Sequence, residues 1–306
     1  MTDRAPAAEQ PWWRKVLEFP LVAMVIALAV VVGTIAAAGA LLTFALTKLV
    51  PMEIRQDHQV LLFNVVAVIG LILVYKLVIR HLGRHKRDDL ALDGWFKETA
   101  AGLGIGFVLM TLAVGVAALF GVYTITGPGD FSFFVAALIG SALFPAVSEE
   151  LIFRGILFRW IEEFGGSWVA LAATSALFGA VHLTNPNASP IAGIAITLEA
   201  GIMLGAAYML TRRLWLAMGI HAAWNFTQGE IWDVPVSGTY VRGLVEAELQ
   251  GPPLLSGGGF GLEASVIAIV IATAFGVYML MRAIRKGELV PPMWVKAKAT
   301  KRLKKA

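Results

Sequence analysis

The chain has 306 residues, of which 58% are hydrophobic and only 15% are charged, with a net charge of +4 and a mean hydropathy of +0.74. Because soluble domains carry about 25% charged residues, this composition excludes an ordinary soluble protein and predicts an integral membrane protein. The chain has no cysteine, which excludes disulfides, thiolate catalysis and cysteine-bound metals.

Apolar segments long enough to cross a bilayer, which takes roughly 20 residues, recur along the whole chain. They lie near 20–48, 59–80, 99–125, 131–160, 168–184, 190–211, 213–229 and 263–284. The predicted fold is therefore an all-α, polytopic membrane bundle of about eight transmembrane helices. We expect residues 1–306 to form a single membrane domain, with no signal peptide, because residues 1–20 mix acids and bases.

The basic residues of the connecting loops predict the orientation of the bundle. Basic residues are frequent in the loop after the second predicted span, in the loop between the sixth and seventh spans, and in the tail beyond Arg282. The loops at 126–130 and 185–189 have no Lys or Arg. Because basic loops stay on the cytoplasmic side, both termini are expected in the cytoplasm.

The lack of a targeting segment fits a bacterial inner membrane. The basic tail is expected to bind anionic lipid headgroups, and nucleic-acid binding is not expected because no folded basic domain accompanies the tail.

The composition of two further segments predicts that they are exposed to solvent. The connection 230–262 is rich in Gly, Pro and Ser and is the longest predicted external loop, either a partial lid or a simple connection. Arg159, Glu162 and Glu163 belong to the cytoplasmic end of the fourth predicted span and are expected to lie in a solvated interface.

The segment FPAVSEELIFRG, residues 144–155, places two adjacent carboxylates in an apolar helix. A carboxylate at membrane depth is costly unless a partner or water reaches it, so the segment is a candidate site. Glu150 and Arg154 are four residues apart and are expected to form an ion pair on one helix face. Glu149 points about 100° away and has no helix-spaced basic partner, so it is the carboxylate free to act on another group.

The spacing of the next helix brings His182 level with Glu149. Gly165 and Gly166 are the expected turn between the two helices. His182 and Glu149 each lie about 21 Å from that turn at about 1.5 Å per residue, so they reach the same depth in an antiparallel hairpin. Phe178 precedes His182 by one helical turn and shares its face.

Three more polar side chains lie in predicted spans. His221 and Asn225 share one helix face, and a buried amide without a partner is costly. A carboxylate, two imidazoles and an amide are the groups needed to activate water and stabilise an oxyanion. Glu199 is either a partner of a histidine or substrate, or a polar residue that lines a hydrated cavity.

Together these motifs resemble the CPBP family of intramembrane proteases, the CAAX protease and bacteriocin-processing (Abi) family. Glu149, Glu150 and Arg154 match its EExxxR motif, Phe178 and His182 match FxxxH, and His221 and Asn225 match HxxxN. The resemblance covers a core at 140–228. It implies a glutamate-dependent endopeptidase similar to CAAX prenyl proteases, in which Glu149 activates water with help from His182. It further implies that His221 and Asn225 stabilise the oxyanion.

The resemblance leaves a metal-dependent mechanism open, since the family was once described as metal-dependent. In that case Glu149, His182 and His221 would hold zinc, which takes Glu and His ligands. The absence of HExxH, the pattern in which two histidines on one helix bind zinc, favours a site without metal or other cofactor.

Three classes of function compete on these observations. The favoured one is a protease whose partner is a peptide or membrane-protein substrate, with its identity and prenylation unspecified by the sequence. A non-enzymatic scaffold or a bacteriocin-immunity protein is the first alternative. A transporter that uses the buried acids as a proton relay is the second, although the inverted repeats typical of transporters are not evident.

Overall fold

The computed structural model describes residues 11–49, 52–130 and 134–295. Six helical segments in this part of the chain are long and apolar enough to cross a membrane. They are Pro20–Lys48, Gln59–His81, Trp95–Leu119, Phe134–Gly165, Pro190–Thr211 and Val266–Arg285. The predicted all-α membrane bundle is confirmed. The count of about eight spans stays a prediction, because the helices α8 (Ser167–His182) and α11 (Trp215–Phe226) are shorter than a full span.

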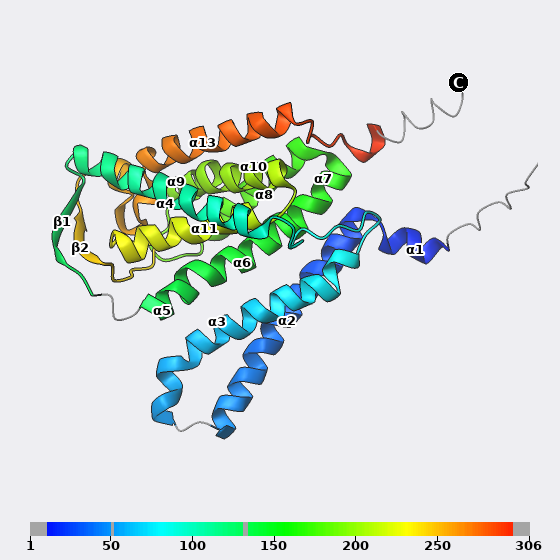
Figure 1. The fold of residues 1–306 in the computed structure, drawn as a ribbon, viewed down its shortest axis with the longest axis horizontal. Coiled ribbons are helices and arrows are strands. Elements are labelled where there is room, and N and C mark those ends of the chain that lie inside the picture. The colour runs from blue at the N-terminus through cyan, green and yellow to red at the C-terminus, as the bar shows by residue number, and fades with distance from the viewer. Residues whose placement is uncertain (1–10, 50–51, 131–133, 296–306) are drawn as a thin grey trace, which may run out of the picture.

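The N-terminal part of the chain forms a helical hairpin. The short helix α1 (Trp12–Leu17) leads into α2 (Pro20–Leu49) and α3 (Met52–Leu77), which ends in a 3₁₀ turn at Ile79–His81. Figure 1 shows that one end of this hairpin packs against the main bundle while the other end projects away from it. Buried residues from α2 and α3, including Leu71 and Tyr75, form a core cluster with α6, α7 and α8.

Helix α4 (Trp95–Leu119) packs its backbone directly against α11. A Cβ at Gly102 would lie 2.5 Å from the Leu216 carbonyl oxygen, and one at Gly106 would lie 2.4 Å from the Ile220 carbonyl oxygen. Small residues one turn apart therefore allow the close helix approach. The prediction that this span reaches residue 125 is wrong, because the chain leaves the helix at Leu119 and Gly121 adopts a positive φ of 70°.

The next helix carries the glutamate motif and is interrupted by π-helical turns. It runs through α5 (Phe134–Ala137), a π-helical segment at Leu138–Leu143, α6 (Phe144–Glu150), a second π-helical segment at Leu151–Phe158, and α7 (Arg159–Gly165). Gly166, with φ 86°, reverses the chain into α8. The predicted antiparallel hairpin is present, and its turn is where the glycine pair predicts it.

The remaining helices complete the bundle around α11. Helix α9 (Pro190–Ile196) continues through a π-helical segment at Thr197–Gly201 into α10 (Ile202–Thr211). Helix α11 continues into a π-helical segment at Thr227–Ile231, and α13 (Val266–Arg285) closes the bundle. Buried side chains of α4, α10, α11 and α13 form the second large core cluster.

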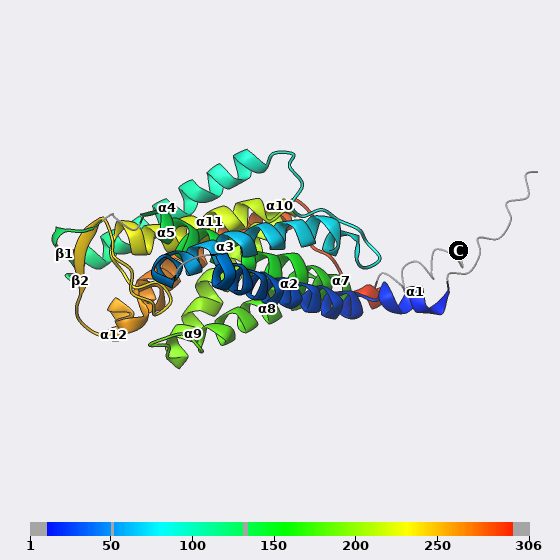
Figure 2. The same cartoon turned by 90° about the horizontal axis from the view of Figure 1, so that it is seen from below.

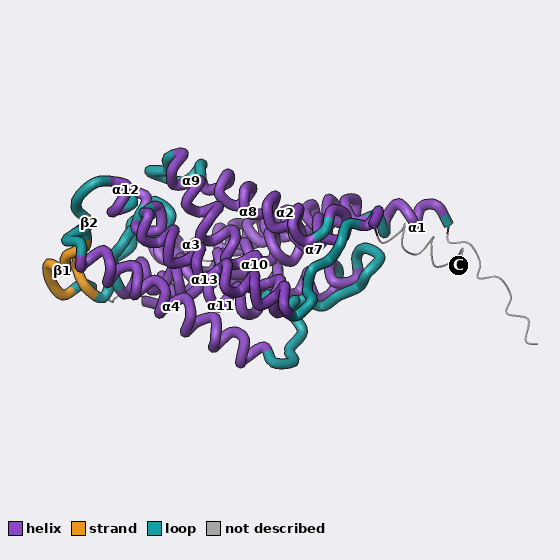
Figure 3. The backbone as a smooth tube through the Cα atoms, turned by 90° about the horizontal axis from the view of Figure 1, so that it is seen from above, coloured by secondary structure: helices purple, strands orange, loops and turns teal. Residues whose placement is uncertain are grey.

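The connection predicted as an external loop is largely folded. Its strand β2 (Val245–Leu249) pairs antiparallel with β1 (Tyr123–Pro128), and α12 (Pro253–Ser256) follows. Figures 2 and 3 show that these strands and their loops cover one end of the bundle. The Asp233 carboxylate accepts the backbone N–H groups of Gly243 and Ala247 at 2.9 and 3.0 Å. This segment is therefore an ordered cap on the bundle.

A buried charged network occupies the opposite end. Arg159 and Glu162 are only 4% and 3% exposed, so the prediction that they lie in a solvated interface is wrong. Arg159 donates to the Arg87 carbonyl oxygen at 3.1 Å, and Glu162 pairs with Arg212 at 2.6 Å. Helix α1 and the chain after α13 lie at this same end (Figure 1), as an even number of membrane crossings requires.

Candidate active site

Glu150 is held by Arg154 in a fully buried ion pair. The Arg154 Nη1 atom lies 2.8 Å from Glu150 Oε1, and neither side chain is exposed to solvent. The other guanidinium nitrogen, Nη2, donates to the carbonyl oxygens of Ala200 and Gly201 at 3.2 and 3.3 Å. The ion pair thus joins the glutamate helix to the π-helical segment before α10, while Glu149 makes no direct ion pair with Arg154.

Phe178 supports three polar side chains at once. The Arg154 guanidinium lies over its ring, 4.7 Å from the centroid. The rings of His182 and His221 lie 4.6 and 6.2 Å from it, centroid to centroid. The aromatic position of the FxxxH pattern therefore packs between the ion pair and both imidazoles, which fixes their relative positions.

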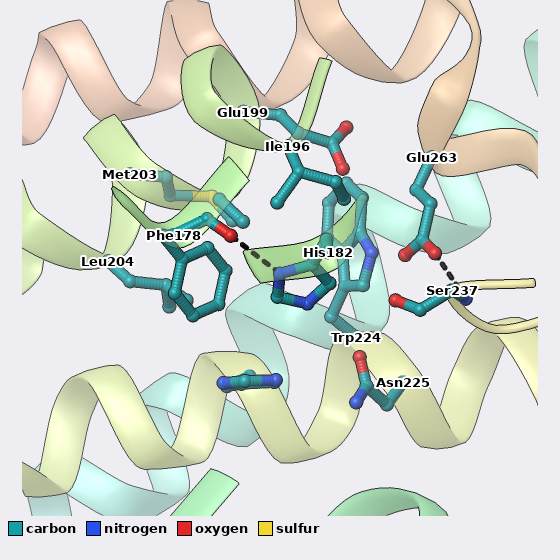
Figure 4. Close-up of a pocket in the computed structure, with 12 residues that line it drawn as sticks. Phe178, His182, Ile196, Glu199, Met203, Leu204, Trp224, Asn225, Ser237 and Glu263 are labelled. Atoms are coloured by element: carbon teal, nitrogen blue, oxygen red, sulfur yellow. Dashed lines mark hydrogen bonds between the residues drawn. The ribbon is translucent and has the colours of Figure 1, made fainter. Parts of the chain in front are cut away.

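His182 is the last residue of α8, and its orientation is set by its own helix. Its Nδ1 atom lies 2.7 Å from the Phe178 carbonyl oxygen (Figure 4). Because a carbonyl oxygen only accepts, Nδ1 carries the proton and donates it. The Nε2 atom faces Glu149 at 3.9 Å from Oε2. The glutamate and the histidine that the hairpin spacing predicts to be level are thus neighbours.

His221 contacts both glutamates through its two ring nitrogens. Its Nδ1 atom lies 2.9 Å from Glu150 Oε1, and its Nε2 atom lies 3.9 Å from Glu149 Oε2. The Glu149 oxygen is therefore equally far from the Nε2 atoms of His182 and His221. Since 3.9 Å exceeds a direct hydrogen bond, neither histidine is hydrogen-bonded directly to Glu149. The contact between Glu150 and His221 is not predicted from the sequence.

Asn225 lies one helical turn beyond His221 and is held by the glutamate helix. Its Nδ2 atom donates to the Ser141 carbonyl oxygen at 3.1 Å, and the Ser141 hydroxyl donates to Glu230 Oε1 at 2.6 Å. One N–H bond of the amide remains available for another acceptor. Ser141 and Glu230 belong to the site's support and carry no signal in the sequence.

The helices that carry Glu149, Glu199 and His221 contain π-helical turns, whereas α8, which carries His182, does not, and two of these π-helical segments supply acceptors to the site. A π-helical turn changes the backbone hydrogen-bond register and is frequent at functional sites. The Ser141 carbonyl oxygen, which binds Asn225, lies in the first such segment. The Ala200 and Gly201 carbonyl oxygens, which bind Arg154, lie in another.

A small pocket adjoins both histidines. Besides apolar residues it is lined by His182, Glu199, His221, Asn225, Ser237 and Glu263. Figure 4 shows His182, Glu199, Asn225, Ser237 and Glu263 converging from α8, the π-helical segment before α10, α11 and the cap. Glu199 therefore lies beside the histidines, whereas Ser237 and Glu263, which belong to the cap, are site neighbours that the sequence does not predict.

The geometry of the donors does not suit a tetrahedral zinc ion. Zinc ligands lie about 2.0–2.1 Å from the metal, which places tetrahedral ligand atoms about 3.4 Å apart. Glu149 Oε2 is 3.9 Å from each histidine nitrogen. In the described part of the chain, no group of three or more His, Asp or Glu residues is arranged to hold a metal ion. We therefore derive no step through zinc.

Comparison with known proteins finds a similarity over one segment of the chain. Residues 130–227 match the family model described as type II CAAX prenyl endopeptidase Rce1-like. The matched segment is about a third of the chain and includes all three motifs. No curated protein and no solved structure matches the chain. The resemblance to CAAX proteases that the motifs predict is thus confirmed over this segment, and it supports a peptidase of that type.

Proposed function

We propose that this protein is an intramembrane endopeptidase of the CAAX protease type, in which Glu149 and two histidines activate a water molecule. The observation that carries the proposal is the equal distance of 3.9 Å from Glu149 Oε2 to His182 Nε2 and to His221 Nε2. A water between these atoms would have its proton acceptor and its orienting partners in place.

The proposed reaction begins with transfer of a proton from this water to Glu149. The resulting hydroxide attacks the carbonyl carbon of the scissile peptide bond, and the carbonyl oxygen becomes an oxyanion. The free N–H of Asn225 and a protonated His221 Nε2 would stabilise that charge. Glu149 then returns its proton to the leaving nitrogen as the C–N bond breaks, which restores the carboxylate.

The charges of the buried cluster favour this assignment of protons. Glu149, whose side chain is 31% exposed, and the buried pair of Glu150 and Arg154 together carry a net charge of −1 beside His221, which favours a protonated imidazole. Protonation of His221, whose Nδ1 donates to the Glu150 carboxylate, brings the cluster to neutrality. His182 instead donates Nδ1–H to a neutral carbonyl, so its Nε2 is suited to accept a hydrogen bond from the water.

The location of the protein and the direction of substrate approach belong to the same proposal. We infer a bacterial inner membrane with both termini in the cytoplasm, and a peptide or membrane-protein substrate. The lipid-binding segment predicted in the basic tail lies largely outside the described residues, because 296–306 are not described.

A comparison of peptide N-termini in native membranes tests the function directly. Membranes that contain the wild-type protein or Glu149→Gln at equal abundance are compared by N-terminal proteomics. We expect a set of N-termini that is present with the wild type and lost with Glu149→Gln, because the amide does not accept a proton at neutral pH. Glu246→Gln, an exposed acid on β2, is the matched control and should retain the set.

A non-enzymatic scaffold or immunity protein is the competing function. In that case the two variants would give the same N-termini as the wild type under every growth condition, while Glu149→Gln would still support the biological phenotype of the protein. That outcome would replace the peptidase proposal.

A further inference from the structure

Two buried acids line the pocket beside the histidines, and neither takes part in the reaction above. Glu199 comes from the π-helical segment before α10, and Glu263 comes from the 3₁₀ turn Leu262–Ala264 at the end of the cap. They are 1% and 2% exposed. Figure 4 shows both carboxyl groups beside the Trp224 ring in the pocket that His182 and His221 also line.

Three buried carboxylates of the bundle have a cation beside them, whereas Glu230 and Asp233 accept hydrogen bonds from Ser141 and from backbone N–H groups instead. Asp89 lies 2.5 Å from Arg87, Glu150 lies 2.8 Å from Arg154, and Glu162 lies 2.6 Å from Arg212. Glu199 and Glu263, in contrast, have no ion pair with Lys or Arg in the part of the chain that the structure describes, and Glu199 Oε2 is a buried oxygen without a hydrogen-bond partner there. The positive charge of His221 acts on Glu263, but Glu199 Oε2 keeps no hydrogen-bond partner among the described residues and is suited to a cation brought by a ligand.

The charge state of Glu263 fits such a ligand. Burial raises the pKa of Glu263 to about 7, while the Ser237 hydroxyl and backbone N–H, the positive charge of His221 and the Trp224 indole act in the opposite direction. Glu199 is the other acid that faces this group. The carboxyl group therefore becomes an anion near neutral pH, where a cation would stabilise it.

The size and walls of the pocket restrict the ligand to a small ammonium group on an apolar stem. The free volume is about 20 Å³, which admits an ammonium head alone, since a water needs about 10–15 Å³. The methylene stem would have to extend from the head toward the opening of the pocket. Ile196, Met203 and Leu204 supply apolar walls for methylene groups, and the Trp224 ring offers a face for a cation.

We propose that Glu199 and Glu263 form a subsite for one primary ammonium group of the substrate, the side chain of a lysine next to the scissile bond. This inference rests on the proposed peptidase function and names the substrate class of the same site. The ammonium group would donate hydrogen bonds to both carboxyl groups and hold the adjacent peptide bond beside His182 and His221.

A binding experiment tests the subsite without any catalysis. The probe is n-butylammonium chloride, which copies a lysine side chain, added to purified Glu149→Gln protein in detergent. Thermal unfolding is measured against probe concentration, with potassium chloride and the neutral N-butylacetamide as controls. We expect a saturable rise in Tm with n-butylammonium alone. A charge-assisted hydrogen bond is worth about 1.5–3 kcal/mol, so Glu199→Gln or Glu263→Gln should weaken this binding about tenfold or more.

Glu246→Gln in the same background is the matched control, because this exposed acid is remote from the pocket residues and should leave binding unchanged. An equal saturable rise with potassium chloride would show an inorganic cation site and overturn the proposal. The absence of any saturable rise, or equal binding in the Glu199→Gln and Glu263→Gln variants, would also overturn it.

The cleavage sites provide a second test that separates the subsite from the reaction. Among N-termini that depend on Glu149, we expect lysine to be enriched within the residues that flank the cleavage, and we expect Glu199→Gln to reduce those cleavages selectively. Glu149-dependent termini without lysine enrichment would overturn the subsite and leave the peptidase intact. If no termini depend on Glu149, the peptidase proposal fails, and the binding experiment alone decides whether the ammonium site exists.

Discussion

At the residue scale, the proposed mechanism depends on Glu150 as much as on Glu149. The two carboxylates are adjacent in the chain but have different partners: Glu150 binds Arg154 and His221 Nδ1, whereas Glu149 faces the two Nε2 atoms. Glu150 therefore acts through His221 as a positioning residue. Its bond to Nδ1 directs Nε2 toward the space beside Glu149 and stabilises a proton on the ring.

Removal of the Arg154 charge should destabilise the whole protein. The variant Arg154→Met keeps most of the side-chain volume but leaves the buried Glu150 without its cation, and breaking a buried ion pair costs about 3–5 kcal/mol. We expect a lower yield and a clearly lower midpoint of thermal unfolding in detergent. The double variant Glu150→Gln/Arg154→Met removes both charges and should recover part of the loss. A wild-type midpoint for Arg154→Met alone would contradict the structural role of the pair.

Glu263 should make stability depend on pH. Burial raises the pKa of Glu263 from its ordinary value of 4.5 to about 7 in the folded protein, so the folded state binds this proton more tightly than the unfolded state. The resulting stability is fully present below about pH 4.5 and is lost as the pH rises through about 7. The difference is on the order of 3 kcal/mol at about 1.4 kcal/mol per pKa unit.

Thermal unfolding at a series of pH values from 5 to 8, in wild type and Glu263→Gln, checks this expectation. The wild type should lose stability toward pH 8, and the glutamine variant, which has no proton to lose, should show a smaller loss. Parallel curves for the two proteins would show that Glu263 does not titrate in this range.

At the element scale, the position of His221 and Asn225 depends on how closely α11 approaches α4. Gly102 and Gly106 lie against the α11 backbone, at the Leu216 and Ile220 carbonyl oxygens. The helix that carries two of the proposed active-site groups is thus located by backbone contact. Side chains that were added there would push α11 away and shift both groups.

Gly106→Ala is therefore expected to destabilise the protein, although alanine favours helices more than glycine does. Its Cβ would lie 2.4 Å from the Ile220 carbonyl oxygen, and overpacking of this kind costs about 1–3 kcal/mol. Gly104→Ala on the same helix meets nothing within 4 Å and is the matched control, expected to be neutral or slightly stabilising. Thermal unfolding and cleavage of native substrates measure both effects. Equal behaviour of the two variants would contradict the packing argument.

The helices and strands also show which parts of the fold and of the candidate site can be predicted from the sequence. Apolar length predicts the long helices, and the glycine pair with equal spacing on either side predicts that Glu149 and His182 meet. The contact of Glu150 with His221 was missed because it joins residues 71 positions apart, through a packing arrangement that has no local signal. The strands were missed because β1 follows an apolar helix without a clear break, and β2 lies in a segment whose Gly and Pro content is typical of loops. The single membrane domain and the core at 140–228 stay predictions.

At the scale of the whole molecule, the bundle has two chemically different ends. One end has the buried network around Arg159, Glu162 and Arg212, together with α1 and the chain after α13. The other end has the strands and the cap that contributes Ser237 and Glu263 to the pocket. Because the cap reaches the pocket, the proposed lysine subsite depends on a segment outside the matched residues 130–227.

The orientation of these two ends in the membrane can be measured with single cysteines, because the chain has none of its own. Lys86 lies in an exposed loop at the charged end, and Glu248 is an exposed residue of β2 at the other end. If the basic loops are cytoplasmic, Glu248→Cys should react with a membrane-impermeant maleimide in intact cells, whereas Lys86→Cys should react only after the membrane is opened. The opposite labelling pattern would reverse the predicted orientation. Labelling of both cysteines from the same side would contradict the arrangement of the bundle itself, because the two ends would then share one face of the membrane.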